Sequence, residues 1–245
     1  MIRVRTAMAA LALLVLGVLV VTAEPTGPPI GRDRLTVALW SLLPVLAVTL
    51  IGLLRRAYWS RWLALGGAIA ILPWATALTV APGPGMSVWR QSLALAAALA
   101  LLLSLPGSAM TERFEGGTIG RDRRDRRFTL VRWAVICNIA SVLALYLFAT
   151  VYKYQVSGYA VITAVLMLGL LVGVLMLAHG RTVGLLAVAA CCLLLVPSGA
   201  FFVWSEARYP GEAILFVLLF LPGVLTGLAS LIAFWRPMRK YVGSD

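Results

Sequence analysis

The segment Gly158–Ala178 reads GYAVITAVLMLGLLVGVLMLA and contains no charged side chain. A helix rises about 1.5 Å per residue and the hydrocarbon core of a bilayer is about 30 Å thick, so about 20 such residues span it. Lipid offers no hydrogen-bond partner to backbone N–H and C=O groups, and a single segment inside lipid must therefore form a helix, which satisfies these groups internally. This stretch predicts an integral membrane protein built from α-helices.

The same pattern recurs along the whole chain, which predicts a single all-α membrane domain over residues 1–245. We expect a polytopic transmembrane bundle of about eight spanning helices, because eight stretches have the required length and apolar content. They cover approximately residues 7–23, 35–54, 62–80, 88–105, 129–151, 158–178, 182–202 and 213–235.

Composition supports this fold class. Hydrophobic residues make up 62% of the chain and charged residues 12%, whereas soluble domains typically have about 45–50% and 25%. A water-soluble interior of this size could not hide so much apolar surface. The net charge of +12 does not indicate nucleic-acid binding, because the basic residues lie in short loops between apolar stretches.

Those basic residues predict the orientation. With the N-terminus inside, 16 of the 21 basic residues fall in inner segments and 5 in outer segments. Cytoplasmic loops are enriched in Lys and Arg, so both termini are expected in the cytoplasm. Removing or adding one interior helix would destroy this sorting. Short loops and heavy use of arginine favour a bacterial inner membrane.

The first apolar stretch has two interpretations. A short basic start, an apolar core and Val21-Thr22-Ala23 resemble a secretory signal peptide with its cleavage site. Cleavage would leave seven helices and the same topology for the remainder. We favour retention of this stretch as the first spanning helix.

Small and polar residues inside the apolar stretches are candidates for close helix packing. Two pairs of glycines with the spacing Gly-x-x-x-Gly allow backbones to approach, and an amide near the middle of a span needs a hydrogen-bond partner on another helix. Packing within the chain is preferred here over an oligomer contact or a substrate path. The residues are Gly169, Gly173, Gly223, Gly227, Asn138 and Ser141.

Two loops carry candidate contact residues. The outer loop 198–212 mixes aromatic and charged side chains and could face a partner or ligand, or simply anchor the chain in the interface; its candidates are Trp204, Glu206, Arg208 and Glu212. The long inner loop 106–127 carries a basic run that could attract anionic lipid headgroups, only set the orientation, or dock a cytoplasmic partner. That run contains Arg121, Arg123, Arg124, Arg126 and Arg127.

A short motif occurs twice. Ile30-Gly31-Arg32-Asp33-Arg34 recurs at residues 119–123, each time before a predicted helix. Because the two helices would run in opposite directions, residues 30–105 and 119–202 are candidates for a weak inverted repeat, as in many secondary transporters. Two similar basic collars in an arginine-rich chain are the simpler interpretation.

The chemistry expected of an enzyme is missing from the sequence. The chain has a single histidine, too few for a zinc site of the His₂ or His₃ type, and no Gly-x-x-x-x-Gly-Lys loop for phosphates. We therefore expect no enzymatic activity and no cofactor. The leading hypothesis is a scaffold or accessory subunit of a membrane assembly, which contacts lipid and other membrane subunits. The alternative is a small secondary transporter or channel-like permease.

Overall fold

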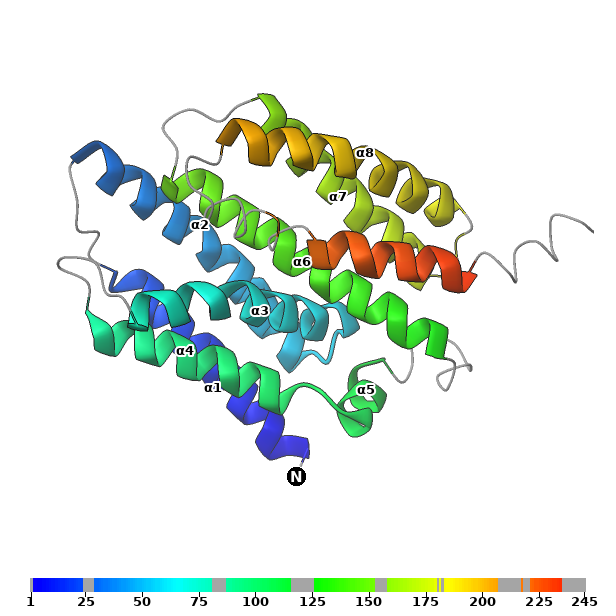
Figure 1. Cartoon of the computed structure of the whole chain (residues 1–245). Helices are drawn as coiled ribbons and strands as arrows, with labels where there is room; N and C mark the ends of the chain where they lie inside the picture. The colour runs from blue at the N-terminus through cyan, green and yellow to red at the C-terminus, as the bar shows by residue number, and fades with distance from the viewer. Residues whose placement is uncertain are drawn as a thin grey trace, which may run out of the picture. The chain divides into compact units, whose positions relative to one another are not determined.

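The computed structural model describes residues 2–23, 29–80, 87–115, 126–152, 158–179, 181, 183–206, 217 and 221–234. Within these ranges all regular structure is helical (Figure 1). The helices are α1 (Ile2–Val21), α2 (Pro29–Leu54), α3 (Tyr58–Val80), α4 (Val88–Ser104), α5 (Ser108–Glu115), α6 (Arg126–Tyr152), α7 (Gly158–Ala178) and α8 (Val183–Glu206). A further helix covers Leu221–Phe234.

Several of these helices identify the protein as embedded in a membrane. By length and composition four can cross a bilayer, namely Ile2–Val21, Thr129–Tyr146, Val161–Ala178 and Val183–Trp204. A fifth crossing arises if α4 and α5 are counted as one bent pair. Trp40–Leu54 and Leu221–Phe234 are shorter apolar helices. The expected count of eight spans and the N-in topology remain predictions.

Helix α5 was not expected from the sequence, which gives residues 106–127 as a loop. Its axis is turned by 85° from that of α4, and Gly107 between them has a φ of +109°. Few residues other than glycine adopt that backbone conformation, so the sharp turn is encoded there. Met110 and Phe114, one helical turn apart, are buried, which gives α5 an inward apolar face.

The chain divides into two compact units. The first contains residues 1–118 and 146–153, and the second contains residues 119–145 and 154–245. Helix α6 contributes to both, since its last turns belong to the first unit, where Tyr146 and Ser41 of α2 share a hydrogen bond. Neither the single domain nor the inverted repeat expected from the sequence is tested by this division.

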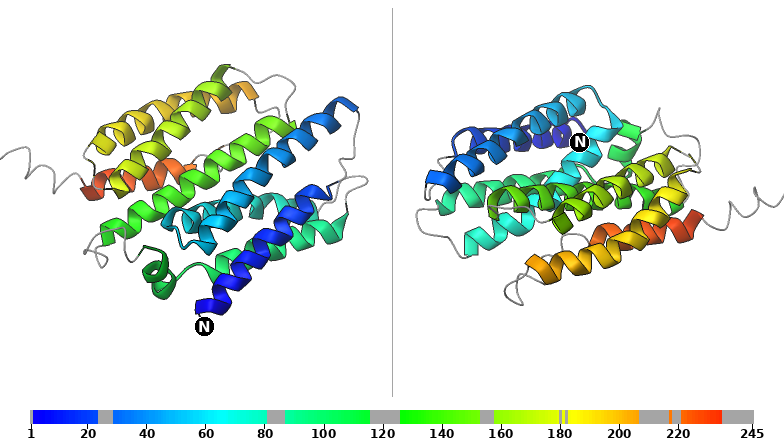
Figure 2. Two further views of the ribbon diagram at one scale, coloured as in Figure 1. Left: turned by 180° about the vertical axis from the view of Figure 1, so that it is seen from behind. Right: turned by 90° about the horizontal axis from the view of Figure 1, so that it is seen from above.

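In the first unit, α1 packs between α2 and α4, and α3 packs along α4 (Figures 1 and 2). Four apolar residues of α1 are buried: Ala9, Ala12, Leu13 and Leu16. The turn from α2 to α3 is tight, because a Cβ on Gly52 would lie 2.6 Å from Cβ of Ser60. The two hydrogen bonds Ala57 N–H to Gly52 O and Arg56 N–H to Leu53 O close the end of α2 in a Schellman motif.

In the second unit, α7 and α8 form a helical hairpin and lie side by side along their length (Figures 1 and 2). The mean hydropathy of the span in α7 is 2.8 and that of the span in α8 is 2.4. Pro197 lies inside α8 without ending it, as is common for membrane helices, where neighbouring groups satisfy the backbone.

Candidate functional site

The amide of Asn138 lies inside the second unit, where 1% of the residue is exposed. Its Nδ2 donates to the carbonyl of Ala134 in the same helix at 2.8 Å and to the carbonyl of Gly223 at 3.4 Å. Its Oδ1 accepts no hydrogen bond from the described residues. The side chain therefore links α6 to the Leu221–Phe234 helix and keeps one unused acceptor.

Gly223 makes this link possible because it has no side chain. A Cβ at this position would lie 2.8 Å from Oδ1 of Asn138 and 3.4 Å from Oγ of Ser141. At Gly227, one turn further on, a Cβ would lie 3.1 Å from Leu170 and 3.2 Å from Sγ of Cys192. The second Gly-x-x-x-Gly pair thus faces α6, α7 and α8 of its own chain.

The first pair lies against α8. A Cβ on Gly169 would lie 2.9 Å from Sγ of Cys191, and one on Gly173 would lie 3.1 Å from the backbone N of Val188. Gly184 of α8 completes the contact, because a Cβ there would lie 2.7 Å from the carbonyl oxygen of Gly173. The two backbones approach closely, which allows extensive van der Waals contact between the helices.

Sulfur and hydroxyl groups lie at the contacts of the Leu221–Phe234 helix. All three cysteines are free. Cys137 of α6 contacts the hydroxyl of Thr226, and Cys192 lies 3.9 Å from the carbonyl oxygen of Val224. The six packing candidates named from the sequence therefore gather within one unit, around the Leu221–Phe234 helix and the α7–α8 hairpin.

The candidates of the outer loop are only partly described. Trp204 lies in the last turn of α8 and is 80% exposed. Glu206 is the final residue of α8, and its side chain lies outside the described part. Arg208 and Glu212 also lie outside the described residues, so a grouping of these four side chains remains a prediction.

The same applies to the basic run. Arg121, Arg123 and Arg124 lie outside the described residues, while Arg126 and Arg127 are the first two residues of α6. The proposed contact with lipid headgroups remains a prediction for these five arginines.

Two arginines that the sequence analysis counts only among the basic residues of inner segments make hydrogen bonds to the end of another helix. The Nη2 of Arg5 in α1 donates to the carbonyls of Leu103 and Pro106, and the Nε of Arg61 in α3 donates to the carbonyl of Leu105 at 3.0 Å. A helix end leaves carbonyls without partners and carries partial negative charge, so cations are favoured there.

One signal for this arrangement is visible in the sequence. The Pro106-Gly107 pair ends α4 and leaves several carbonyls to be satisfied by other groups. The identity of those groups could not be read from the sequence, because Arg5 is about a hundred positions away along the chain.

Within the described residues, no group of three or more His, Cys, Asp or Glu side chains is placed to hold a metal ion. Comparisons with protein-family models, with curated proteins and with solved structures returned no match to this chain.

Proposed function

We propose that this protein is a non-enzymatic scaffold or accessory subunit of a membrane assembly, with eight spanning helices and both termini in the cytoplasm of a bacterial cell. The observation that carries the proposal is the use of its buried polar groups. Six of them donate to backbone carbonyls: Thr49, Ser60, Arg61, Ser104, Asn138 and Ser230. Four of these six groups bond only within their own helix or the turn that begins it. The other two join separate parts of the chain, Arg61 of α3 to the end of α4 and Asn138 of α6 to Gly223, and such links suit a rigid framework.

The surface proposed to hold the partner is the outward face of α8. Leu186 and Leu193 are each 75% exposed and Trp204 is 80% exposed, placing three of the most exposed large apolar side chains on this helix. A partner's transmembrane helix could lie along this ridge. Trp204 would then sit at the edge of the contact, at the membrane interface where tryptophan is favoured.

The test is photo-crosslinking in native membranes. A benzophenone amino acid at Leu193 is expected to join the protein to a second polypeptide, and the same group at Val165 of α7, which is 60% exposed, is expected to label lipid alone. If Leu193 also labels only lipid, and the protein purifies from mild detergent as a lone monomer, the scaffold proposal is wrong.

A small transporter or channel-like permease is the second candidate, because two buried oxygens have no partner among the described residues. They are Oδ1 of Asn138 and Oγ1 of Thr163, and such acceptors could bind a passing solute or cation. Ion flux into proteoliposomes that is lost in Asn138→Ala would favour this function. Proteoliposomes that are no more permeable to ions than protein-free liposomes would refute the transporter function.

A further inference from the structure

A groove runs between α1 and α2 of the first unit. Its volume is about 350 Å³ and its walls are almost entirely apolar. The lining residues include Leu13, Gly17 and Val21 from α1 and Leu43, Ala47 and Leu50 from α2. At its centre, a Cβ on Gly17 would meet no atom within 4 Å, so the glycine leaves open space that a larger side chain would fill.

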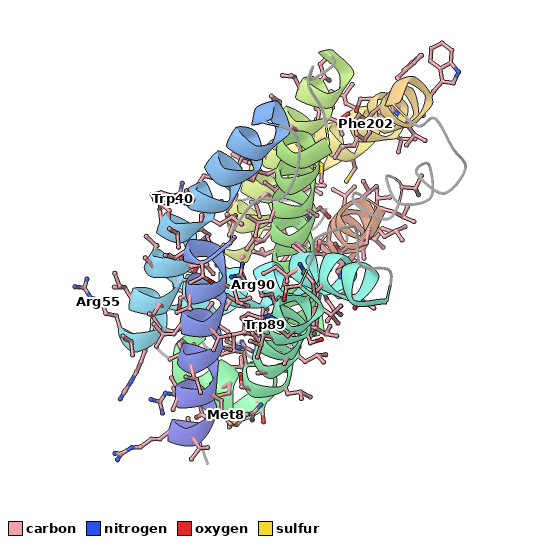
Figure 3. All side chains as sticks on the ribbon, turned by 90° about the vertical axis from the view of Figure 1, so that its left-hand side faces the viewer. Met8, Trp40, Arg55, Trp89, Arg90 and Phe202 are labelled. Carbon is pink, nitrogen blue, oxygen red and sulfur yellow. The ribbon has the colours of Figure 1, made fainter. Side chains whose placement is uncertain are left out.

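The end of the α1–α2 pair is strongly basic. The two helices run antiparallel (Figures 1 and 2), which puts the start of α1 and the end of α2 at the same end. Arg3, Arg55 and Arg56 are exposed there, and Figure 3 shows Arg55 projecting away from the helices. The described residues give these three guanidinium groups no ion-pair partner.

We propose that the groove holds an acyl chain of one anionic phospholipid, whose phosphate lies at Arg3, Arg55 and Arg56. Apolar walls alone would not retain a lipid, because the surrounding bilayer is equally apolar. The headgroup decides the occupant, since juxtamembrane arginines attract anionic headgroups. This inference needs only a membrane-embedded chain and is independent of the scaffold function.

A second copy of the chain fits the groove less well. A symmetric dimer through α1 and α2 would bring two sets of the same exposed arginines together, and juxtaposed like charges oppose association. A phospholipid supplies the opposite charge and an apolar chain in one molecule. The arginines used to tie down α4, Arg5 and Arg61, are not part of the proposed site.

Native mass spectrometry of the delipidated full chain tests the proposal, with phosphatidylglycerol and phosphatidylcholine of the same acyl chains as probes. We expect one phosphatidylglycerol to bind at least tenfold more tightly than phosphatidylcholine. The triple variant Arg3→Gln, Arg55→Gln, Arg56→Gln is expected to lose that preference. Gly17→Leu is expected to lose the bound lipid with all arginines intact.

Matched controls keep the test interpretable. Ala96→Leu adds a similar volume at an exposed position of α4. Arg90→Gln removes an arginine near the start of α4, away from the basic end formed by Arg3, Arg55 and Arg56. Both variants are expected to bind phosphatidylglycerol as the unaltered protein does. If Gly17→Leu does not fold, Ala47→Leu fills the groove from α2.

Four outcomes would overturn the proposal. Equal binding of both lipids would remove the headgroup preference, and full binding to both Gly17→Leu and Ala47→Leu would place the lipid elsewhere. A dimer that disappears in the groove-filling variants would identify a second chain as the occupant. Displacement of phosphatidylglycerol by inorganic phosphate at comparable concentration would show a phosphate site without a chain site.

Discussion

At the scale of the residue, Asn138 combines a satisfied donor with an unsatisfied acceptor inside a membrane helix. Asn138→Ala removes the bond to the carbonyl of Gly223, and interhelical hydrogen bonds in membranes contribute about 0.6 kcal/mol on average and about 1.7 at most. We expect a loss of about 1 kcal/mol in the free energy of unfolding, measured by SDS titration in detergent micelles.

The control for this measurement is Leu130→Ala on the exposed face of the same helix. It is expected to change the free energy of unfolding less than Asn138→Ala. Asn138→Asp is expected to cost more than either, because an ionised carboxylate near a helix centre costs about 2.5–3.5 kcal/mol. An alanine variant as stable as the unaltered protein would contradict the linking role.

Arg61, in contrast, is a charged residue whose burial is explained by the hydrogen bond that it donates to the end of α4. It is 6% exposed and binds the carbonyl of Leu105 where α4 ends. Arg61→Met would leave that buried carbonyl without this partner, at a cost of about 1–3 kcal/mol. We expect faster hydrogen exchange across α5 in this variant, followed by mass spectrometry, and no change in Arg55→Met. Unchanged exchange in α5 would show that Arg61 does not hold the turn.

At the scale of the element, the α7–α8 hairpin depends on direct contact between the two helix backbones, which leaves no room for a side chain at Gly184. A Cβ on Gly184 would meet Gly173 O at 2.7 Å and the backbone N of Leu177 at 2.8 Å. Backbone atoms cannot rotate away, so Gly184→Ala is expected to cost about 1–3 kcal/mol by overpacking. Gly17→Ala, where nothing lies within 4 Å, is the matched control and is expected to be neutral or slightly stabilising in thermal unfolding. Equal melting temperatures for the two variants would refute this account.

The helices were largely predictable from the sequence because lipid imposes a single local rule, the internal satisfaction of every backbone group. Each predicted stretch overlaps a helix of the structure, although for 213–235 the described helix covers only Leu221–Phe234. Helix α5 was not predicted because it has only 8 residues and few of them are apolar. The spacing of Met110 and Phe114 was its only signal, and two residues do not establish a period.

The site was predictable in part for the same reason. Glycine pairs and a central amide point to close helix contact whatever the partner, and the structure places all six of these residues in one unit. The sequence could not show which helices they join, nor that Gly184, a lone glycine outside both pairs, makes the closest backbone approach. Such contacts depend on tertiary arrangement rather than on local pattern.

At the scale of the whole molecule, five arginines of the first unit gather at one end. Arg3, Arg5, Arg55, Arg56 and Arg61 lie at the start of α1 and at the turn between α2 and α3, and cytoplasmic ends carry such an excess. The turn between α4 and α5 lies at that end too, since Arg5 and Arg61 reach it. The predicted orientation therefore places Ser108 on the cytoplasmic side.

Cysteine accessibility tests the orientation directly. A membrane-impermeant maleimide applied to intact cells is expected to label Ser87→Cys, before α4, and to label Ser108→Cys only after the cells are opened. The unaltered protein, with three cysteines inside its helices, measures background labelling. Labelling of Ser108→Cys in intact cells would reverse the orientation.

The bonds from Arg5 to the end of α4 also constrain the order of assembly. Helix α1 is synthesised before α4, and the carbonyls that its Arg5 binds belong to residues 98 and 101 positions later. Until those residues are synthesised, the guanidinium group has no acceptor there, and α1 can pack against α2 but not yet against α4. A nascent chain stalled ahead of Leu103 would therefore hold α1 through α2 alone, without the bonds from Arg5.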